Sequence, residues 1–255
     1  MKPFDKYWYY RDAVQAPDVD ARFMFNLYRR LRGRKPKVLH EDFCGTFANL
    51  CEWVKINPQT KGIGIDLDPE PLAYGCEHYL PRLTTAQQKR LKLLQANVLT
   101  ARPGLADVVL ALNFSYYIFK TRKELLNYFR HAYAGLSGRG IFVVDAFGGP
   151  ACAEANVDRT RKRGYTYFWE QVNFEPITNL AKFQIHFKRD GEKIRKKVFC
   201  YDWRMWSLPE IREAMLDAGF RKTAVYWEDD HGDFRPGTKG DADCTAWIAY
   251  VVGLR

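Results

Sequence analysis

The chain has 255 residues, of which 47% are hydrophobic and 27% are charged, and its formal net charge is +10. This composition excludes an intrinsically disordered chain, and the length suffices for one α/β domain with a full hydrophobic core. The segment from Met1 to Asp20 carries charges and tyrosines, and no uninterrupted apolar stretch reaches the roughly 18 residues of a membrane span. We therefore expect a cytoplasmic protein with no membrane association.

The basic charge and the cysteines select no partner by themselves. An isoelectric point near 9.3 attracts anions, nucleic acid among them, but many proteins with a solvated basic surface share it. The six cysteines are scattered without C-x-x-C spacing. The sequence therefore predicts neither a disulfide framework nor a metal site.

The first elements form a strand, a tight turn and a helix. Apolar residues four apart predict a helix over 18–32, which the cluster Gly33–Pro36 ends. A short apolar run opens at Val38 and breaks at Glu41–Thr46, and apolar residues then recur at helical spacing from Phe47. This pattern predicts the first strand of a sheet and the helix that follows it.

The same pattern then repeats along the chain. Residues 62–65 read as a strand that ends in Asp66, and a helix follows from Pro69 through Tyr79. Further strands are expected at 91–99, 107–112 and 140–144, with a helix over 123–136 before the last of them. Strands that alternate with helices favour a parallel sheet covered on both faces.

From about Tyr165 the pattern becomes that of antiparallel strands. Residues 165–169 are rich in strand formers, residues 183–187 alternate at period two, and Asp190-Gly191 is a hairpin turn signal. A return strand over 193–203 completes an insertion of about three strands. A helix from Ser207 to Gly219 and two strands, 222–228 and 244–252, follow.

Two turns of the expected sheet are chemically marked. Ligands of open parallel sheets bind beyond the carboxyl ends of the strands, near the point where strand order reverses. The first turn offers Gly45 for close backbone approach, followed by a helix amino terminus. Asp66 lies where an acidic side chain accepts hydrogen bonds from ribose hydroxyls. The dinucleotide fingerprint G-x-G-x-x-G is absent, which disfavours an NAD enzyme.

These motifs resemble those of class I S-adenosylmethionine-dependent methyltransferases. Residues 38–46 (VLHEDFCGT) resemble the first motif of that family and residues 62–69 (GIGIDLDP) the second, within a similarity that covers about 37–146. The resemblance implies a Rossmann-like α/β fold: a seven-stranded, mostly parallel sheet with helices on both faces and a small antiparallel insertion after the fifth strand. It also implies S-adenosylmethionine as cofactor and S-adenosylhomocysteine as product.

The resemblance also divides the chain into parts. We expect one methyltransferase domain over 1–255, in which 1–36 form an amino-terminal lid or helix and 37–150 the cofactor-binding core. The antiparallel insertion on the substrate side then spans 151–206, and the last helix and strands span 207–255.

The resemblance assigns cofactor contacts residue by residue. Asp66 matches the ribose-binding acid, while Asp68 caps the next helix; Asn97 stands where the family usually has Asp. Phe43 and Phe47 stand where glycine is usual, and their rings could reshape or block the turn. The cofactor-binding residues expected on this basis are Glu41, Phe43, Cys44, Gly45, Thr46, Asp66, Leu67, Asn97, Val98, Asn113 and Phe114.

The acceptor side is marked mainly by aromatic residues. Methyl transfer from a sulfonium needs alignment of the reactants more than a dedicated base, so no catalytic residue is assigned; the candidates are Tyr10, His186 and His231. The cluster Tyr7–Tyr10 forms either a lid or a packing surface. An aromatic pocket suits an amine, and the expected substrate-binding residues are Tyr9, Tyr10, Tyr116, Trp169 and Trp203.

Three functions are therefore compatible with the sequence. The first is transfer of a methyl group to a nitrogen or oxygen of a small molecule by in-line displacement. The second is RNA or protein methylation that uses the basic clusters of the insertion, 161–163, 188–189 and 193–197, which are also typical of a solvated strand face. The third is a non-catalytic binding protein that has kept the fold.

Overall fold

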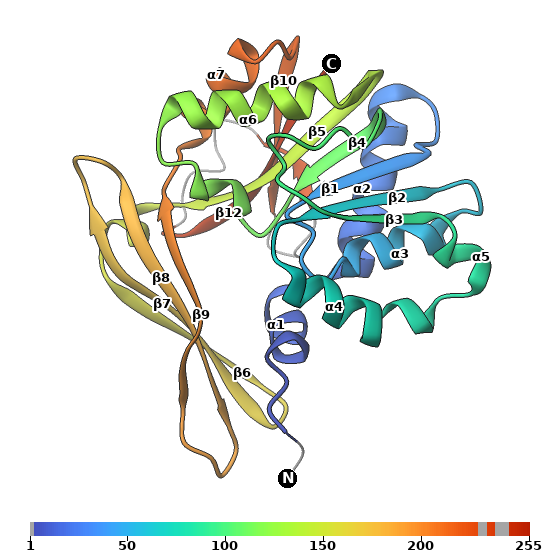
Figure 1. Cartoon of the computed structure of the whole chain (residues 1–255). Coiled ribbons are helices and arrows are strands. Elements are labelled where there is room, and N and C mark those ends of the chain that lie inside the picture. The colour runs from blue at the N-terminus through green and yellow to red at the C-terminus, as the bar shows by residue number, and fades with distance from the viewer. Residues whose placement is uncertain (1–2, 229–233, 238–244) are drawn as a thin grey trace.

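The computed structural model describes residues 3–228, 234–237 and 245–255. Its main sheet confirms the expected α/β fold and has one strand more than the seven expected, because short β11 pairs with β10 at one edge (Figure 1). In spatial order the strands are β11 (Phe234–Pro236), β10 (Lys222–Glu228), β12 (Trp247–Leu254), β5 (Leu136–Gly148), β4 (Ala106–Ala111), β1 (Val38–Asp42), β2 (Lys61–Asp66) and β3 (Leu91–Gln95).

Strand order reverses between β1 and β4, which is where open sheets of this kind bind ligands. The strands β3, β2, β1, β4 and β5 are parallel, and β12 runs antiparallel between β5 and β10. Parallel strands place their carboxyl ends at one edge, so the turns after β1, β2 and β4 meet there.

Helices cover both faces of this sheet, as expected. Alternate residues of β4 and β5 enter two separate hydrophobic clusters, Val109 with Phe142 in one and Val108 with Ile141 in the other. The first cluster lies under α6 (Arg122–Ala134) and α7 (Leu208–Asp217), the second under α2 (Pro17–Arg32), α3 (Ala48–Ile56) and α4 (Pro69–His78). Burial on both faces explains the continuous apolar runs of the central strands.

Side-chain caps set the boundaries of these helices. The Ser207 side chain accepts from the backbone N–H of Glu210, and the Glu210 carboxylate accepts from the backbone N–H of Ser207. This capping box confirms the expected start of α7. Thr121 and Glu124 form the same box at α6. The helix α2 ends at Gly33 with a φ of 69°, in the left-handed region.

The connection from β3 to β4 differs from the other crossovers because it contains no helix. The strand expected over 91–99 ends at Gln95, since the Asn97 side chain accepts from the backbone N–H of Leu99 and closes a turn. After the short helix α5 (Thr85–Gln88) and β3, residues 96–105 cross over as a loop. The strand β3 therefore stays partly exposed along its length.

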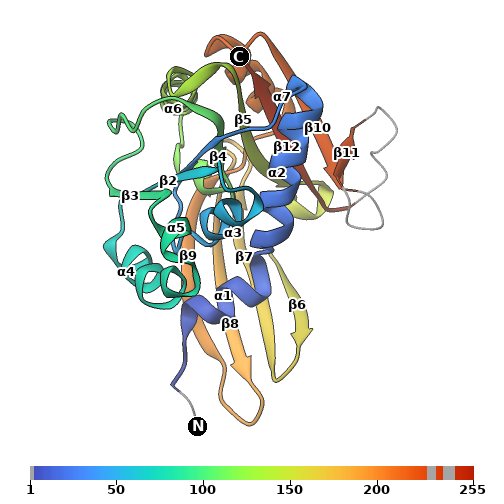
Figure 2. The same ribbon diagram turned by 90° about the vertical axis from the view of Figure 1, so that its right-hand side faces the viewer.

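The insertion is a separate antiparallel sheet beside the main sheet (Figures 1 and 2). Its strands are β6 (Asn156–Lys162), β7 (Tyr165–Glu175), β8 (Leu180–Arg189) and β9 (Arg195–Arg204). The expectation of about three strands missed β6, whose charged sequence lies exposed on the edge. The predicted turn at Asp190-Gly191 joins β8 to β9, with Gly191 at a φ of 76°.

The aromatic amino-terminal segment forms helix α1 (Lys6–Val14), which bridges the insertion and α4 (Figure 2). Toward the insertion, the Tyr9 ring lies 4.8 Å from that of Tyr165. Toward α4, Lys6 pairs with Glu70 at 2.5 Å, and the Tyr74 hydroxyl donates to Asp5 at 2.7 Å. The segment thus packs against the insertion sheet; a lid motion stays a prediction.

No helix in the described part of the chain is long and apolar enough to cross a membrane.

The contact between Phe47 and Gly75 supplies a test of this packing. A Cβ at Gly75, within α4, would lie 2.4 Å from the Phe47 ring and from the Thr46 carbonyl oxygen. We expect Gly75→Ala to destabilise the fold by about 1–3 kcal/mol through overpacking, despite the higher helix propensity of alanine. Urea unfolding measures this change.

The matched control is Gly138→Ala, where the new Cβ meets nothing within 4 Å. We expect a change within about 0.5 kcal/mol there. Equal stability of the two variants would contradict the proposed packing of α4 on the first turn.

Candidate functional site

A hydrogen bond joins the first two turns at the carboxyl edge of the sheet. The backbone N–H of Gly45, after β1, donates to Asp66 Oδ2 at 2.7 Å. Gly45 has a φ of 52°, and a Cβ built there would meet nothing within 4 Å. The turn is therefore fixed by Asp66 while the space above Gly45 stays open to a ligand.

The second turn separates the roles of its two acids. Asp66 Oδ1 accepts from the backbone N–H of Asp68 at 2.9 Å, and burial raises the pKa of Asp66. Asp68 accepts from the backbone N–H of Glu70, which confirms that it caps α4. Leu67, between them, is 66% exposed, an apolar side chain that a ligand at this edge would cover.

The rings of Phe43 and Phe47 pack away from each other. Both residues have left-handed backbone, with φ of 55° and 49°. The Phe47 ring is fully buried in the cluster under α3 and α4, and the Phe43 ring packs 5.6 Å from that of Tyr128 in the cluster on the other face. Each ring is thus accommodated in a hydrophobic cluster, and Gly45 between them stays accessible.

Glu41 is a buried acid with spare hydrogen-bonding capacity. Its Oε1 accepts from Asn49 Nδ2 at 2.6 Å, while its Oε2 is buried without a partner among the described residues. Burial raises the pKa of Glu41 to about 8. A buried oxygen without a partner is costly, so it indicates a place for a ligand or water donor.

The third and fourth turns meet the same edge. The backbone N–H of Ala96 donates to the Asp66 carbonyl oxygen at 2.9 Å, which places Asn97 and Val98 beside the second turn. After β4, Asn113 and Phe114 both have left-handed backbone, with φ of 56° and 57°. The structure thus gathers the cofactor residues expected from sequence at one edge.

Asp145 of β5 is a site residue that the sequence analysis missed. Its carboxylate accepts from the backbone N–H groups of Asn113 at 2.7 Å and Phe114 at 2.9 Å, so it holds the left-handed turn after β4. Burial raises the pKa of Asp145 to about 7. A lone acid within the apolar run of 141–147 was the available signal.

Cys44 and Thr46 complete the first turn. The backbone N–H of Cys44 donates to the Ile65 carbonyl at 3.0 Å, and burial raises the pKa of its thiol. A buried, protonated thiol is a packing residue rather than a nucleophile. The Thr46 carbonyl lies against Gly75 of α4.

Aromatic residues of α1 and the insertion form a group that contains several of the expected substrate-binding residues. The hydroxyl groups of Tyr10 and Tyr201 interact, and burial raises the pKa of Tyr10 to about 12. The Asp145 charge also acts on the Tyr10 hydroxyl. Trp203 stacks on Tyr201 with ring centroids 4.3 Å apart, and Trp169 stacks on Phe183. Tyr10, Trp169 and Trp203 therefore belong to one aromatic group between the insertion and β5.

The other expected acceptor residues lie around this group. Tyr116 is fully buried, and its hydroxyl donates to the Asp145 carbonyl at 2.9 Å, so it supports the site from beneath. Tyr9 lies in the seam between α1 and the insertion, stacked on Phe4.

His186, one of the two histidine candidates, does not join the group. His186 pairs in register with Phe168, on the face of the insertion opposite Ile185. Its Nδ1 accepts from the backbone N–H of Lys197 at 2.8 Å, and its Nε2 lies 2.6 Å from Glu170, which is a structural role. His231 lies outside the described residues.

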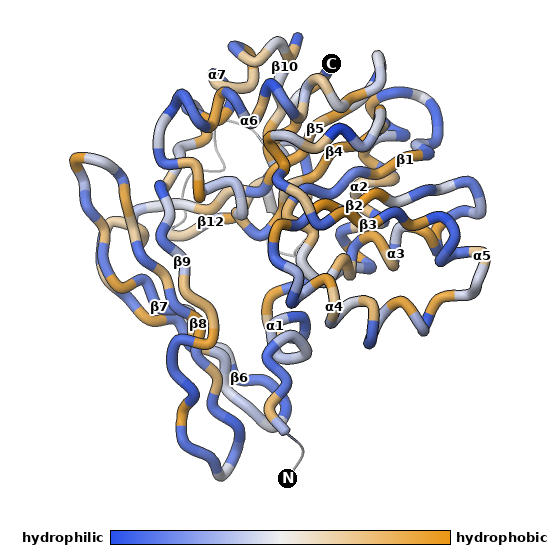
Figure 3. The backbone as a smooth tube through the Cα atoms, in the orientation of Figure 1, coloured by the Kyte–Doolittle hydropathy of each residue, from blue (hydrophilic) through white to orange (hydrophobic). Residues whose placement is uncertain are grey.

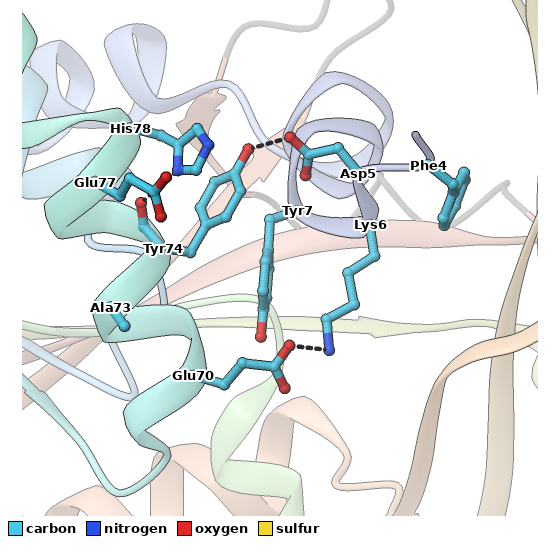
Figure 4. A pocket seen from close by; sticks show the side chains of 9 residues that line it. All are labelled: Phe4, Asp5, Lys6, Tyr7, Glu70, Ala73, Tyr74, Glu77 and His78. Atoms are coloured by element: carbon cyan, nitrogen blue, oxygen red, sulfur yellow. Dashed lines mark hydrogen bonds and ion pairs between the residues drawn. The ribbon is translucent and has the colours of Figure 1, made fainter. Parts of the chain in front are cut away.

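A surface cavity of about 430 Å³ lies at the seam of α1 and α4, next to the second turn (Figure 4). Tyr7 and Tyr74 stand side by side in it, and the Tyr7 hydroxyl points toward Glu70. The charges of Asp66 and Asp68 also act on Tyr7, so the seam lies near the turn after β2.

No protein-family model and no curated protein sequence matches this chain. Solved structures do match it. The sugar N-methyltransferase KedS8 from Streptoalloteichus is 19% identical, and the match covers 100% of this chain and 94% of that one with a TM-score of 0.67. CalS10, an amino pentose methyltransferase from Micromonospora echinaspora, is 18% identical over 98% of both chains, with a TM-score of 0.69.

A third match is the glycopeptide N-methyltransferase MtfA in complex with S-adenosylmethionine. It is 14% identical, and the match covers 94% of this chain and 95% of that one with a TM-score of 0.59. The chain thus has, over nearly its whole length, the fold of S-adenosylmethionine-dependent methyltransferases that act on small molecules.

The buried Glu41 makes stability depend on pH in a predictable direction. Because the pKa of Glu41 is raised from 4.5 to about 8, its contribution to stability is fully present below pH 4.5 and is lost as the pH rises through 8. Between pH 5 and 8.5, we expect the free energy of unfolding of the wild type to fall by on the order of 2–4 kcal/mol more than that of Glu41→Gln. Urea unfolding at each pH measures both.

In Glu41→Gln, the glutamine retains an acceptor for Asn49 and does not titrate. Asp145 titrates in both proteins, so its contribution drops out of the difference between the two pH profiles. Parallel pH profiles of the two proteins would show that Glu41 has no raised pKa.

Proposed function

We propose that this protein is an S-adenosylmethionine-dependent methyltransferase that transfers a methyl group to a nitrogen or oxygen of a small molecule. The observation that carries the proposal is the Asp66–Gly45 hydrogen bond at the point where strand order reverses. It presents a carboxylate and an open glycine turn side by side, in a chain whose fold matches enzymes of this activity over nearly its full length.

The residues at this edge fit the cofactor. In the proposed arrangement Asp66 accepts hydrogen bonds from the ribose hydroxyls, and exposed Leu67 covers one face of the adenine. Asn97 and Val98 face the edge of the adenine, beside Asp66. Gly45 leaves room for the methionine end, near the unpartnered Oε2 of Glu41. Cys44, Thr46, Asn113 and Phe114 complete the contacts.

The cofactor, when bound, supplies an electrophilic methyl group on a sulfonium centre. The chain then has to align an acceptor with that methyl group and exclude water. Asp145 fixes the turn of Asn113 and Phe114, and the stacked rings of Trp203 and Tyr201 close the opposite side. Aromatic faces favour an amine as the acceptor, since its cation interacts with π systems.

Tyr10 serves to position the acceptor rather than to remove a proton. With a pKa of about 12 its hydroxyl stays protonated at neutral pH. Its hydroxyl lies beside that of Tyr201, and a phenol that stays protonated can donate its O–H to an acceptor. A donor in this place orients the lone pair of an acceptor toward the methyl group.

The first test is cofactor binding by Asp66→Ala. Hydrogen bonds to a charged group are worth roughly 1.5–3 kcal/mol, so we expect at least about a tenfold loss of affinity for S-adenosylmethionine and S-adenosylhomocysteine. Isothermal titration calorimetry measures it. The control, Asp68→Ala, removes only the cap of α4 and is expected to lose stability but not affinity.

Absence of binding by the wild type would leave the chain a non-catalytic relative of these enzymes. A larger loss in the Asp68 variant than in the Asp66 variant would reverse the assigned roles.

The second test follows labelled methyl transfer to a panel of amines, hydroxyl compounds and RNA. On the best acceptor we expect Tyr10→Phe to lower kcat/KM by about tenfold, because one hydrogen bond of roughly 1–1.5 kcal/mol is removed. Cofactor affinity should not change. The control Tyr133→Phe removes a hydroxyl from α6, where the ring packs on Phe220 away from the aromatic group, and should retain activity; an equal loss in both variants would refute the positioning role.

A further inference from the structure

The insertion carries more of the positive charge than its share of the chain. Between Asn156 and Arg204 there are twelve Lys and Arg residues against six Asp and Glu residues, so this segment provides a net +6 of the +10 of the whole chain. Figure 3 shows the hairpin loop that joins β8 to β9 as a mostly hydrophilic stretch at the free end of the sheet. The charge is thus concentrated on the part of the molecule that projects from the main sheet.

The carboxylates of this segment are largely paired with cations nearby. Asp190 binds Arg161 through both oxygens at 2.6 and 2.7 Å, and Glu192 pairs with Arg189 and Arg195. Glu170 faces His186, and Asp202 pairs with Lys120 of the main domain. These pairs, with Arg204 bound to Glu210, leave a set of cations for which no ion pair is found among the described residues: Arg159, Lys162, Arg163, Lys182, Lys188, Lys193, Lys196 and Lys197.

The strand register places several of these cations on one face around an aromatic ring. Arg159 on β6 is paired with Phe168 on β7, and its guanidinium lies 5.9 Å from the ring centroid. In the next row of the same face, Lys188 lies on one side of Thr166, and Arg161, which is paired with Asp190, lies on the other. Lys196 also lies on this face, because its neighbour Arg195 pairs in register with Phe187 on the opposite one. This outer face is opposite to the one that packs on α1, since Ile185 and Phe187 point to α1 and His186 and Lys188 do not.

The outer face therefore combines a partly exposed aromatic ring with cations spread over adjacent strands. Sheets that bind single-stranded nucleic acid use this combination, because phosphates pair with the cations while bases stack on the aromatic ring. An acidic protein or a membrane surface would bind to the cations, but its binding would not require an aromatic ring between them. We infer that the outer face of the insertion, centred on Phe168, Arg159 and Lys188, binds single-stranded nucleic acid without strong sequence preference.

This inference does not depend on methyl transfer, because the outer face lies opposite to the acceptor side. It holds whether or not the cofactor binds. If both functions hold, the inner face of the insertion closes the acceptor site while its outer face holds a polyanion.

The test is fluorescence anisotropy of the full chain with labelled single-stranded RNA of about 15 nucleotides, in about 0.1 M salt. We expect a micromolar Kd that weakens steeply with added salt, as release of counterions from the strand requires. The variant Arg159→Glu/Lys188→Glu/Lys196→Glu should weaken binding more than tenfold. Phe168→Ala should weaken it about tenfold at constant charge.

The matched control reverses three exposed lysines of the main domain, Lys89→Glu/Lys92→Glu/Lys123→Glu, with the same change in net charge. We expect the RNA affinity of this control to fall by less than about threefold, because only the long-range effect of net charge is changed. Urea unfolding of every variant checks that it is folded and needs no cofactor. Cofactor calorimetry is run separately, so a failure of the proposed enzyme function is distinguished from a failure of RNA binding.

Three results would overturn the inference. The first is no binding of RNA by the wild type, and the second is an equal loss in the two triple variants. The third is equal affinity for polyglutamate of the same charge, which would assign the face to acidic proteins in general.

Discussion

The hydrogen bond between the Gly45 N–H and the Asp66 carboxylate is the interaction on which the site depends. It joins the turns after β1 and β2, which are adjacent in the sheet but 21 residues apart in sequence. The same carboxylate orders the backbone of Asp68 and hence the start of α4. One side chain thereby fixes two turns and a helix around a space that remains open, which is a requirement for binding a ligand without reorganisation.

Two further buried acids, on β1 and β5, also order the turns near the site. Glu41 and Asp145 both lie in an environment that disfavours their charge, yet each keeps backbone or side-chain donors that order the surrounding turns. Such groups are costly to stability and are typical of functional sites. A cofactor with a positively charged sulfonium and ammonium is the kind of ligand that would offset this cost.

The sequence predicted the core of the fold because alternation of strands and helices depends on local periodicity. It missed β6, whose charges follow no apolar pattern because an exposed edge strand needs none. It also missed Asp145, since nothing local shows that its partners are the N–H groups of Asn113 and Phe114. The directions of the Phe43 and Phe47 rings were equally inaccessible, because left-handed backbone and two opposed hydrophobic clusters determine them together.

The crossover of residues 96–105 has a consequence for how binding and local motion are related. Helices α3 and α4 pack on one face of β3, but no helix follows in the crossover, and partly exposed β3 ends directly in the loop that holds Asn97 and Val98. A strand with so little cover opens at a lower free-energy cost than the centre of the sheet. Under the proposed arrangement, the adenine of the cofactor lies against the end of β3. Binding of the cofactor and amide hydrogen exchange in β3 are therefore thermodynamically linked. Binding of the methyl donor would then shift the ensemble toward conformations in which β3 and the 96–105 loop are ordered.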